Sequence, residues 1–165
     1  MIYSALIPLL IFLPNVVLIF APPIKDSLPE KINKTASYIL FETIEWISRL
    51  FILVIPFFSK IYLGGGIENW CLAIMFIAMG LYYLVWARYM FGGRDYRLLY
   101  SNLWKIPLPL ALSPFIYFLG ASFILHSMPM LLTAITFGAT HIHISRLERD
   151  RLLCASQNCT SLTSS

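Results

Sequence analysis

Two glutamates and an arginine stand inside an otherwise apolar stretch of the sequence, residues 36–58. Glu42, Glu45 and Arg49 lie within about 60° of one another on a helix, because each residue turns the helix by about 100°. Glu45 and Arg49 also have the i,i+4 order, acid before base, that pairs best on a helix. Carboxylates beside a guanidinium can bind a polar ligand or transfer protons. They can equally hold helices together, and both interpretations stay open.

A second polar set lies in the last apolar stretch, where Thr133, Thr136, Thr140 and His143 recur at spacings of 3, 4 and 3. These spacings place the four side chains on one helix face, with His141 on a neighbouring face. We expect the threonine face to meet the charged face described above. The alternatives are threonines bonded to their own helix carbonyls and a histidine that reaches lipid headgroups. The predicted ligand-binding residues are Glu42, Glu45, Arg49, Thr136, Thr140 and His143.

Other reactive patterns do not occur in the sequence. His141 and His143 point about 200° apart on a helix, so they cannot share one metal ion. There is no Glu-x-x-His or His-x-x-x-His spacing, no serine in a G-x-S-x-G context and no phosphate-binding glycine loop. We therefore predict no metal site and no cofactor, and we assign no catalytic residue.

The composition indicates which solvent surrounds these groups. The chain has 165 residues, of which 59% are hydrophobic and 12% are charged. Soluble domains contain about 25% charged residues, so half that share is typical of a membrane protein. The net charge of +4 comes from basic residues in short segments between apolar runs. That placement is explained by membrane topology, and we expect no nucleic-acid partner.

Five apolar runs are long enough to cross a bilayer, which requires about 20 residues. The sequence therefore predicts an all-α fold, a polytopic transmembrane helical bundle of five spans. Pro8 and Pro14 should kink the first span, and Ala134 and Gly138 predict a close helix contact in the last. The alternative is a four-span protein from which the first run is removed, although that run lacks a basic leader and a small-residue cleavage site. The predicted spans are residues 2–23, 36–58, 70–91, 107–125 and 128–145.

Residues 94–105 are charged and aromatic, and they connect spans three and four. Their apolar side chains share one helical face, which predicts a short amphipathic helix lying in the membrane interface. Arg88, Arg94 and Arg97 are the predicted contacts to lipid headgroups. The alternative is that this segment only anchors the protein at the interface.

The lysines and arginines predict the orientation. Ten of the twelve fall in segments on one side of the predicted membrane, Lys60 falls on the other, and Arg49 lies within a span. Because basic loops stay in the cytoplasm, we expect the N-terminus outside and the C-terminus inside, in the plasma membrane. Residues 1–146 would form one transmembrane domain, and residues 147–165 a polar cytoplasmic tail.

These features favour a small integral membrane protein that binds an amphiphilic or lipid-like ligand in a polar cavity within the bundle. Apolar walls with a few converging polar groups are how such sites are built. A non-catalytic accessory or assembly subunit of a membrane complex is the alternative, and a membrane-embedded enzyme is a third. The expected partners are the lipid bilayer, a lipid-like small molecule, and another membrane protein or a second copy of the chain.

Overall fold

The computed structural model describes residues 2–24, 35–103 and 106–162, with side chains described between residues 3 and 154 of those ranges. Over these residues the protein is all-α, as the sequence predicted. They contain no strand, and the one β-type contact among them is an isolated bridge between Leu103 and Ile106.

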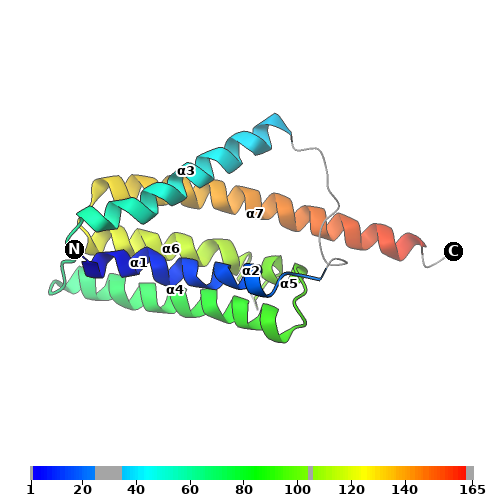
Figure 1. Ribbon diagram of the computed structural model, residues 1–165, viewed down its shortest axis with the longest axis horizontal. Helices are drawn as coiled ribbons and strands as arrows, with labels where there is room; N and C mark the ends of the chain where they lie inside the picture. The colour runs from blue at the N-terminus through cyan, green and yellow to red at the C-terminus, as the bar shows by residue number, and fades with distance from the viewer. Residues whose placement is uncertain (1, 25–34, 104–105, 163–165) are drawn as a thin grey trace.

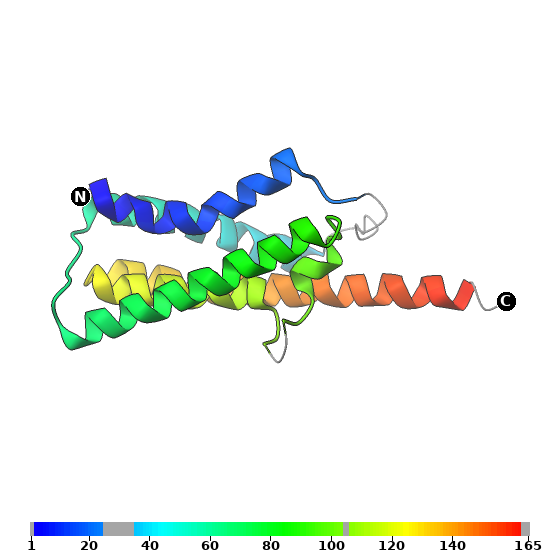
Figure 2. The ribbon, with the colours of Figure 1, turned by 90° about the horizontal axis from the view of Figure 1, so that it is seen from below.

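The first apolar run forms an interrupted helix made of η1 (Ile2–Ala5), α1 (Leu6–Phe12), η2 (Leu13–Val16) and α2 (Val17–Phe20). The α-helix changes to a 3-10 helix around Pro14, and the ribbon bends there (Figure 2). Proline has no N–H, so the carbonyl four residues earlier, that of Leu10, loses its helical donor. The hydroxyl of Tyr83 donates to this Leu10 oxygen at 2.8 Å. A neighbouring helix thus compensates for the break.

The rest of the described chain continues the up-and-down arrangement. Five helical passes alternate between the two ends of the bundle, so the N-terminus and the end of the last helix lie at opposite ends (Figure 1). The predicted helix between the third and fourth passes is present and short. The later elements are α3 (Ala36–Phe58), α4 (Gly66–Phe91), α5 (Arg97–Tyr100), α6 (Pro109–Ile124) and α7 (Met128–Leu162).

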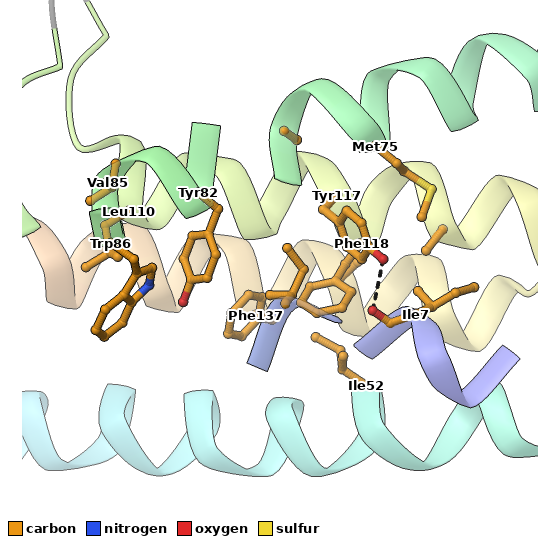
Figure 3. Close-up of a cluster of buried hydrophobic side chains, with 14 of the residues drawn as sticks. Ile7, Ile52, Met75, Tyr82, Val85, Trp86, Leu110, Tyr117, Phe118 and Phe137 are labelled. Carbon is orange, nitrogen blue, oxygen red and sulfur yellow. Dashed lines mark hydrogen bonds between the residues drawn. The ribbon is translucent and has the colours of Figure 1, made fainter. Parts of the chain in front are cut away.

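Three helix contacts build the bundle: α4 packs on α6, α6 packs on α7, and α3 packs along α7. The beginning of α3 diverges from the first helical pass and from α4 (Figure 1). At the centre, Tyr82, Trp86, Phe118 and Phe137 are buried among aliphatic side chains (Figure 3). The Tyr117 hydroxyl ties the first pass to this core by donating to the Ile7 carbonyl oxygen at 2.9 Å.

Large apolar side chains also cover the outside of the bundle. Exposed examples are Trp46 and Phe51 on α3, and Trp70 and Phe91 on α4. Glu45, on the same helix as Trp46, is only 5% exposed. The bundle therefore turns apolar rings outward and holds a carboxylate inside.

Two of the described helical segments are long and apolar enough to cross a membrane, Tyr3–Phe20 and Gly66–Phe91. Pro109–Ile124 is apolar but shorter. The helix α3 has 23 residues and includes the three charged groups singled out from the sequence. By length and composition, the structure thus supports two of the five predicted spans.

The helix α7 runs for 35 residues without interruption, through the predicted boundary after residue 146. Two side chains beyond that boundary pack on the bundle. Leu152 is buried, and Glu148 accepts a hydrogen bond of 2.9 Å from the Tyr38 hydroxyl. The first part of the predicted tail is thus a helix in contact with α3.

Candidate functional site

Glu45 is the centre of a buried polar cluster between α3 and α7. Its Oε1 atom accepts a hydrogen bond from the Arg49 guanidinium one turn later. The same oxygen lies 2.8 Å from Nδ1 of His141. An ionised carboxylate only accepts hydrogen bonds, so the proton of this contact is on Nδ1 of the imidazole. One acid therefore joins a cation from its own helix to a histidine from the facing helix.

Aromatic rings enclose the guanidinium of Arg49. Its central carbon lies 5.5 Å from the ring centroid of Trp46 and 6.0 Å from that of Phe137. The ring of Phe137 in turn stacks on His141 at a centroid distance of 5.0 Å. The Arg49 Nε atom is buried, and no hydrogen-bond acceptor faces it among the described residues. The ion pair thus satisfies one end of the guanidinium and leaves a donor on the other.

A cavity of about 220 Å³ lies beside Arg49. Every one of the five helical passes contributes to its wall, together with the segment around α5. Arg49 and His141 are on the wall, whereas Glu45 lies behind them. The lining consists of Ile11, Phe12, Asn15, Leu18, Arg49, Tyr82, Trp86, Tyr96, Leu99, Tyr100, Leu110, Pro114, Phe137 and His141.

Trp86 is also on this wall, and it interacts with the side chain of Tyr82. The residue is 4% exposed, and its indole nitrogen has no acceptor at bonding geometry among the described residues. The nitrogen is on the side of the ring nearest Tyr82 (Figure 3). The Tyr82 hydroxyl itself donates to Oδ1 of Asn15 at 2.9 Å.

Two phenols line the cavity at its α5 side. The hydroxyls of Tyr96 and Tyr100 lie 3.0 Å apart. Burial raises the pKa of both phenols above the ordinary tyrosine value. Both therefore stay uncharged at neutral pH, and Arg49 is the one Asp, Glu, Lys or Arg side chain on the described wall.

The structure brings only part of the predicted ligand site together. Glu45 and Arg49 are in contact, and Glu42 is half-buried on α3, outside the cavity lining. The hydroxyls of Thr136 and Thr140 donate to carbonyl oxygens of their own helix, at 3.0 Å and 2.9 Å. Ligand contacts by these residues stay predictions.

His143, the histidine chosen from the sequence, is exposed, and its ring lies 4.5 Å from that of Phe41. The histidine at the cavity is instead His141. Sequence reasoning also missed Trp86 and Asn15. Asn15 had a usable signal, because it interrupts the first apolar run. Trp86 had none, because nothing in the sequence distinguishes it from an interfacial tryptophan.

The predicted headgroup residues lie at the end of the bundle that holds α5. The Arg88 Nη1 atom donates to the carbonyl of Asn102 at 3.1 Å. Arg94 is exposed, and its φ of 63° is in the left-handed region. Arg97 lines a groove of about 250 Å³ together with Arg149. Their lipid contacts stay predictions.

Within the described ranges, no group of three His, Cys, Asp or Glu side chains is arranged to hold a metal ion. Comparison with protein-family models, curated proteins and solved structures finds no significant match to the chain.

Proposed function

We propose that the protein is an integral membrane protein of five spans that binds the head of an amphiphilic, lipid-like molecule in the cavity beside Arg49. The observation that carries the binding proposal is the cavity itself, whose mostly apolar wall includes a few polar side chains, among them Arg49, Asn15 and His141. Apolar pockets with a few directed polar groups are typical of small-molecule sites.

The outer surface supports the membrane part of the proposal. Monomeric soluble proteins rarely expose contiguous apolar patches beyond a few hundred Å². Here exposed leucines, isoleucines, phenylalanines and tryptophans occur along the first pass, α3 and α4. Charge in a bilayer is tolerated when it faces the bundle interior and is paired. Glu45 and Arg49 meet both conditions, so these two of the three charges on α3 are compatible with a span.

The two ends of the bundle support the proposed orientation. The five passes are an odd number, so the first and the last helix end at opposite ends of the bundle (Figure 1). Among the described lysines and arginines outside α3, all but Lys60 lie at the α5 end. Lys60 lies in the loop at the other end. Under the positive-inside rule the α5 end is cytoplasmic. The basic residues at that end are Arg88, Arg94, Arg97, Arg146, Arg149 and Arg151.

The orientation can be tested with two thiols at opposite ends. Cys154 is naturally exposed near the α5 end. Gly66→Cys supplies the other reporter, because a Cβ at this position meets no atom within 4 Å. In a background with Cys71→Ala and Cys159→Ser, we expect a membrane-impermeant thiol reagent to label Gly66→Cys on intact cells. Cys154 should react only after permeabilisation, and the opposite pattern would contradict the orientation.

Binding can be tested by filling the cavity. Leu110 is on the lining, so Leu110→Trp should occupy the space that a ligand head needs. Leu132→Trp is the matched control, since Leu132 is exposed on the outer surface of α7. We expect native mass spectrometry of the purified protein to show a co-purified amphiphile that Leu110→Trp loses and Leu132→Trp retains. An accessory-subunit role predicts identical spectra for both variants when folding is equal.

A further inference from the structure

The groove lined by Arg97 and Arg149 lies between the α5 segment and α7, at the end of the bundle that the proposed orientation makes cytoplasmic. Resting on the membrane part of the proposed function, we infer that this groove binds the phosphate head of an anionic phospholipid of the inner leaflet. The cavity beside Arg49 plays no part in this inference. Of the three headgroup residues predicted from the sequence, only Arg97 is on the described lining of the groove.

The groove presents two arginines from different elements. Arg97 belongs to α5 and is exposed, and Arg149 belongs to α7 and is half-buried. Among the described residues, neither guanidinium forms an ion pair with a carboxylate, whereas those of Arg49 and Arg151 do. The described lining contains no acidic side chain. A phosphate accepts paired hydrogen bonds from arginine, so two converging guanidinium groups are well suited to hold one.

The acidic residues beside these arginines are engaged elsewhere. Oδ1 of Asp95 accepts a hydrogen bond of 2.9 Å from the backbone N–H of Arg97. Asp150 is exposed and lines a separate pocket together with Arg146. Further arginines lie at the same end of the bundle, so they outnumber the two aspartates and leave the region positively charged.

Asn102 holds the segment after α5 against α7. Nη1 of Arg149 donates to Oδ1 of Asn102 at 3.3 Å, and Nη1 of Arg88 donates to the Asn102 carbonyl oxygen at 3.1 Å. Both acceptors are uncharged oxygens. The guanidinium of Arg149 is therefore positioned without losing its charge, and its five N–H groups exceed what this one contact uses.

The groove also has an apolar side. Leu152 is buried and Leu153 is 51% exposed, and both line the groove next to the arginines. The glycerol ester and the first methylene groups of a lipid can cover such a surface, whereas a small soluble phosphate compound would leave it in water. The combination of guanidinium groups and leucines thus favours a phospholipid as the occupant.

The position of the groove along α7 matches the headgroup layer. Arg149 lies about six helical turns after Met128, the first residue of α7, which is about 32 Å at 1.5 Å per residue. The hydrocarbon core of a bilayer is about 30 Å thick, and the headgroup regions extend it to about 40–45 Å. An α7 that begins at the outer edge of the core therefore places Arg149 among the inner headgroups, where anionic lipids concentrate in the cytoplasmic leaflet.

Native mass spectrometry of the purified full-length protein in an uncharged detergent measures this binding. The probes are phosphatidylglycerol and phosphatidylcholine with the same acyl chains, because the choline cation is repelled by the arginines. We expect phosphatidylglycerol to bind about tenfold or more tightly, since each arginine near a membrane surface strengthens the attraction of anionic lipid about fivefold. Equal affinities for the two lipids would overturn the inference.

Two matched double variants locate the site. Arg97→Gln with Arg149→Gln removes two positive charges from the groove and should lower the affinity for phosphatidylglycerol about tenfold or more. Lys60→Gln with Arg151→Gln removes two charges elsewhere, because Lys60 is at the other end of the bundle and Arg151 faces Tyr38 of α3. This control should leave the affinity unchanged. Equal losses in both double variants would show that net charge alone attracts the lipid, and the groove would be rejected.

A single variant covers the case in which the double variant does not fold. Arg97→Gln changes one exposed side chain and should lower the affinity for phosphatidylglycerol about fivefold, against no change for Lys60→Gln alone. A soluble phosphate is tested by competition. An equal concentration of glycerol 3-phosphate should leave phosphatidylglycerol bound, and its displacement would overturn the lipid as the occupant.

These outcomes are distinguishable from failure of the proposed function. Thiol labelling as expected, combined with no preference between the two lipids, would overturn the groove alone. Labelling opposite to that expected would overturn the orientation, and with it the assignment to the inner leaflet, whatever the lipid preference in detergent. The amphiphile that Leu110→Trp should lose tests the cavity separately.

Discussion

Two helix contacts in the same bundle are held by opposite means. The contact between α3 and α7 contains a buried ion pair and a histidine, Glu45, Arg49 and His141. The contact between α4 and α6 depends on close approach: a Cβ added to Gly120 would lie 2.7 Å from Cγ of Met75. In hydrocarbon, where apolar side chains gain little by leaving the lipid, polar pairing and close packing are the two ways to join helices. In this bundle, polar pairing joins α3 to α7 and close packing joins α4 to α6.

The two contacts should therefore respond differently to substitutions that change charge pairing and to substitutions that change side-chain volume. The α3–α7 contact should depend on which groups are paired and should tolerate changes of shape. The α4–α6 contact should depend on volume and be indifferent to charge elsewhere. Substitutions that change pairing without adding volume, or volume without changing pairing, test this difference.

The largest effect is expected for Glu45→Ala, which leaves Arg49 and His141 without their shared acceptor. Breaking a buried pair by removing one partner costs about 3–5 kcal/mol, so the free energy of unfolding should fall by roughly that amount. The double variant Glu45→Leu with Arg49→Met should recover most of the loss, because no buried charge remains. Thermal unfolding in detergent measures both. A double variant as unstable as the single one would show that volume, not pairing, governs this contact.

A smaller effect is expected for Gly120→Ala at the apolar contact. The new methyl group would meet the Met75 side chain and lie 3.3 Å from the carbonyl oxygen of Cys71, which is backbone and cannot move easily. Overpacking of this kind typically costs about 1–3 kcal/mol. Gly80→Ala on α4 is the matched control, since a Cβ there meets nothing within 4 Å. The control should be neutral or stabilising by up to about 1 kcal/mol, and equal loss in both variants would argue against close approach.

The smallest effect is expected for Thr136→Val. The Thr136 hydroxyl is exposed and donates to the Leu132 carbonyl of its own helix. Its removal should change the free energy of unfolding by less than about 0.5 kcal/mol. Co-purification of an amphiphile, measured by native mass spectrometry on the same preparation, should be unchanged. A loss of binding would restore Thr136 to the ligand site, where the sequence pattern had placed it.

Local signals in the sequence predicted the helices well. The second predicted span, residues 36–58, coincides with α3 (Ala36–Phe58), and the pairing of Glu45 with Arg49 follows from their spacing. The predicted small-residue contact is also present, because Gly138 lies against the side chain of Phe115. All of these depend on residues within a few turns of one helix.

Features that depend on helix rotation and on several passes were not predictable. Close approach at Gly138 turns α7 so that His141 faces Glu45, while His143 points elsewhere, about 140° from Gly138 around the helix. Helical periodicity alone does not say which face meets which neighbour. The cavity is harder still to predict, because its wall needs side chains from all five passes at once.

In the five-span topology that we propose, the placement of the acid and its cation on one helix has a consequence for biosynthesis. A polar segment must partition into the bilayer before its later neighbours have been translated, and each lone charge raises the cost of that step by about 2.5–3.5 kcal/mol. Glu45 and Arg49 are one turn apart, so they can neutralise each other as the segment leaves the translocon. The imidazole of His141, 96 residues further along the chain, arrives only after insertion is complete. Moving the cation from position 49 to α7 would preserve the finished contact and yet leave the nascent helix with an unmatched acid.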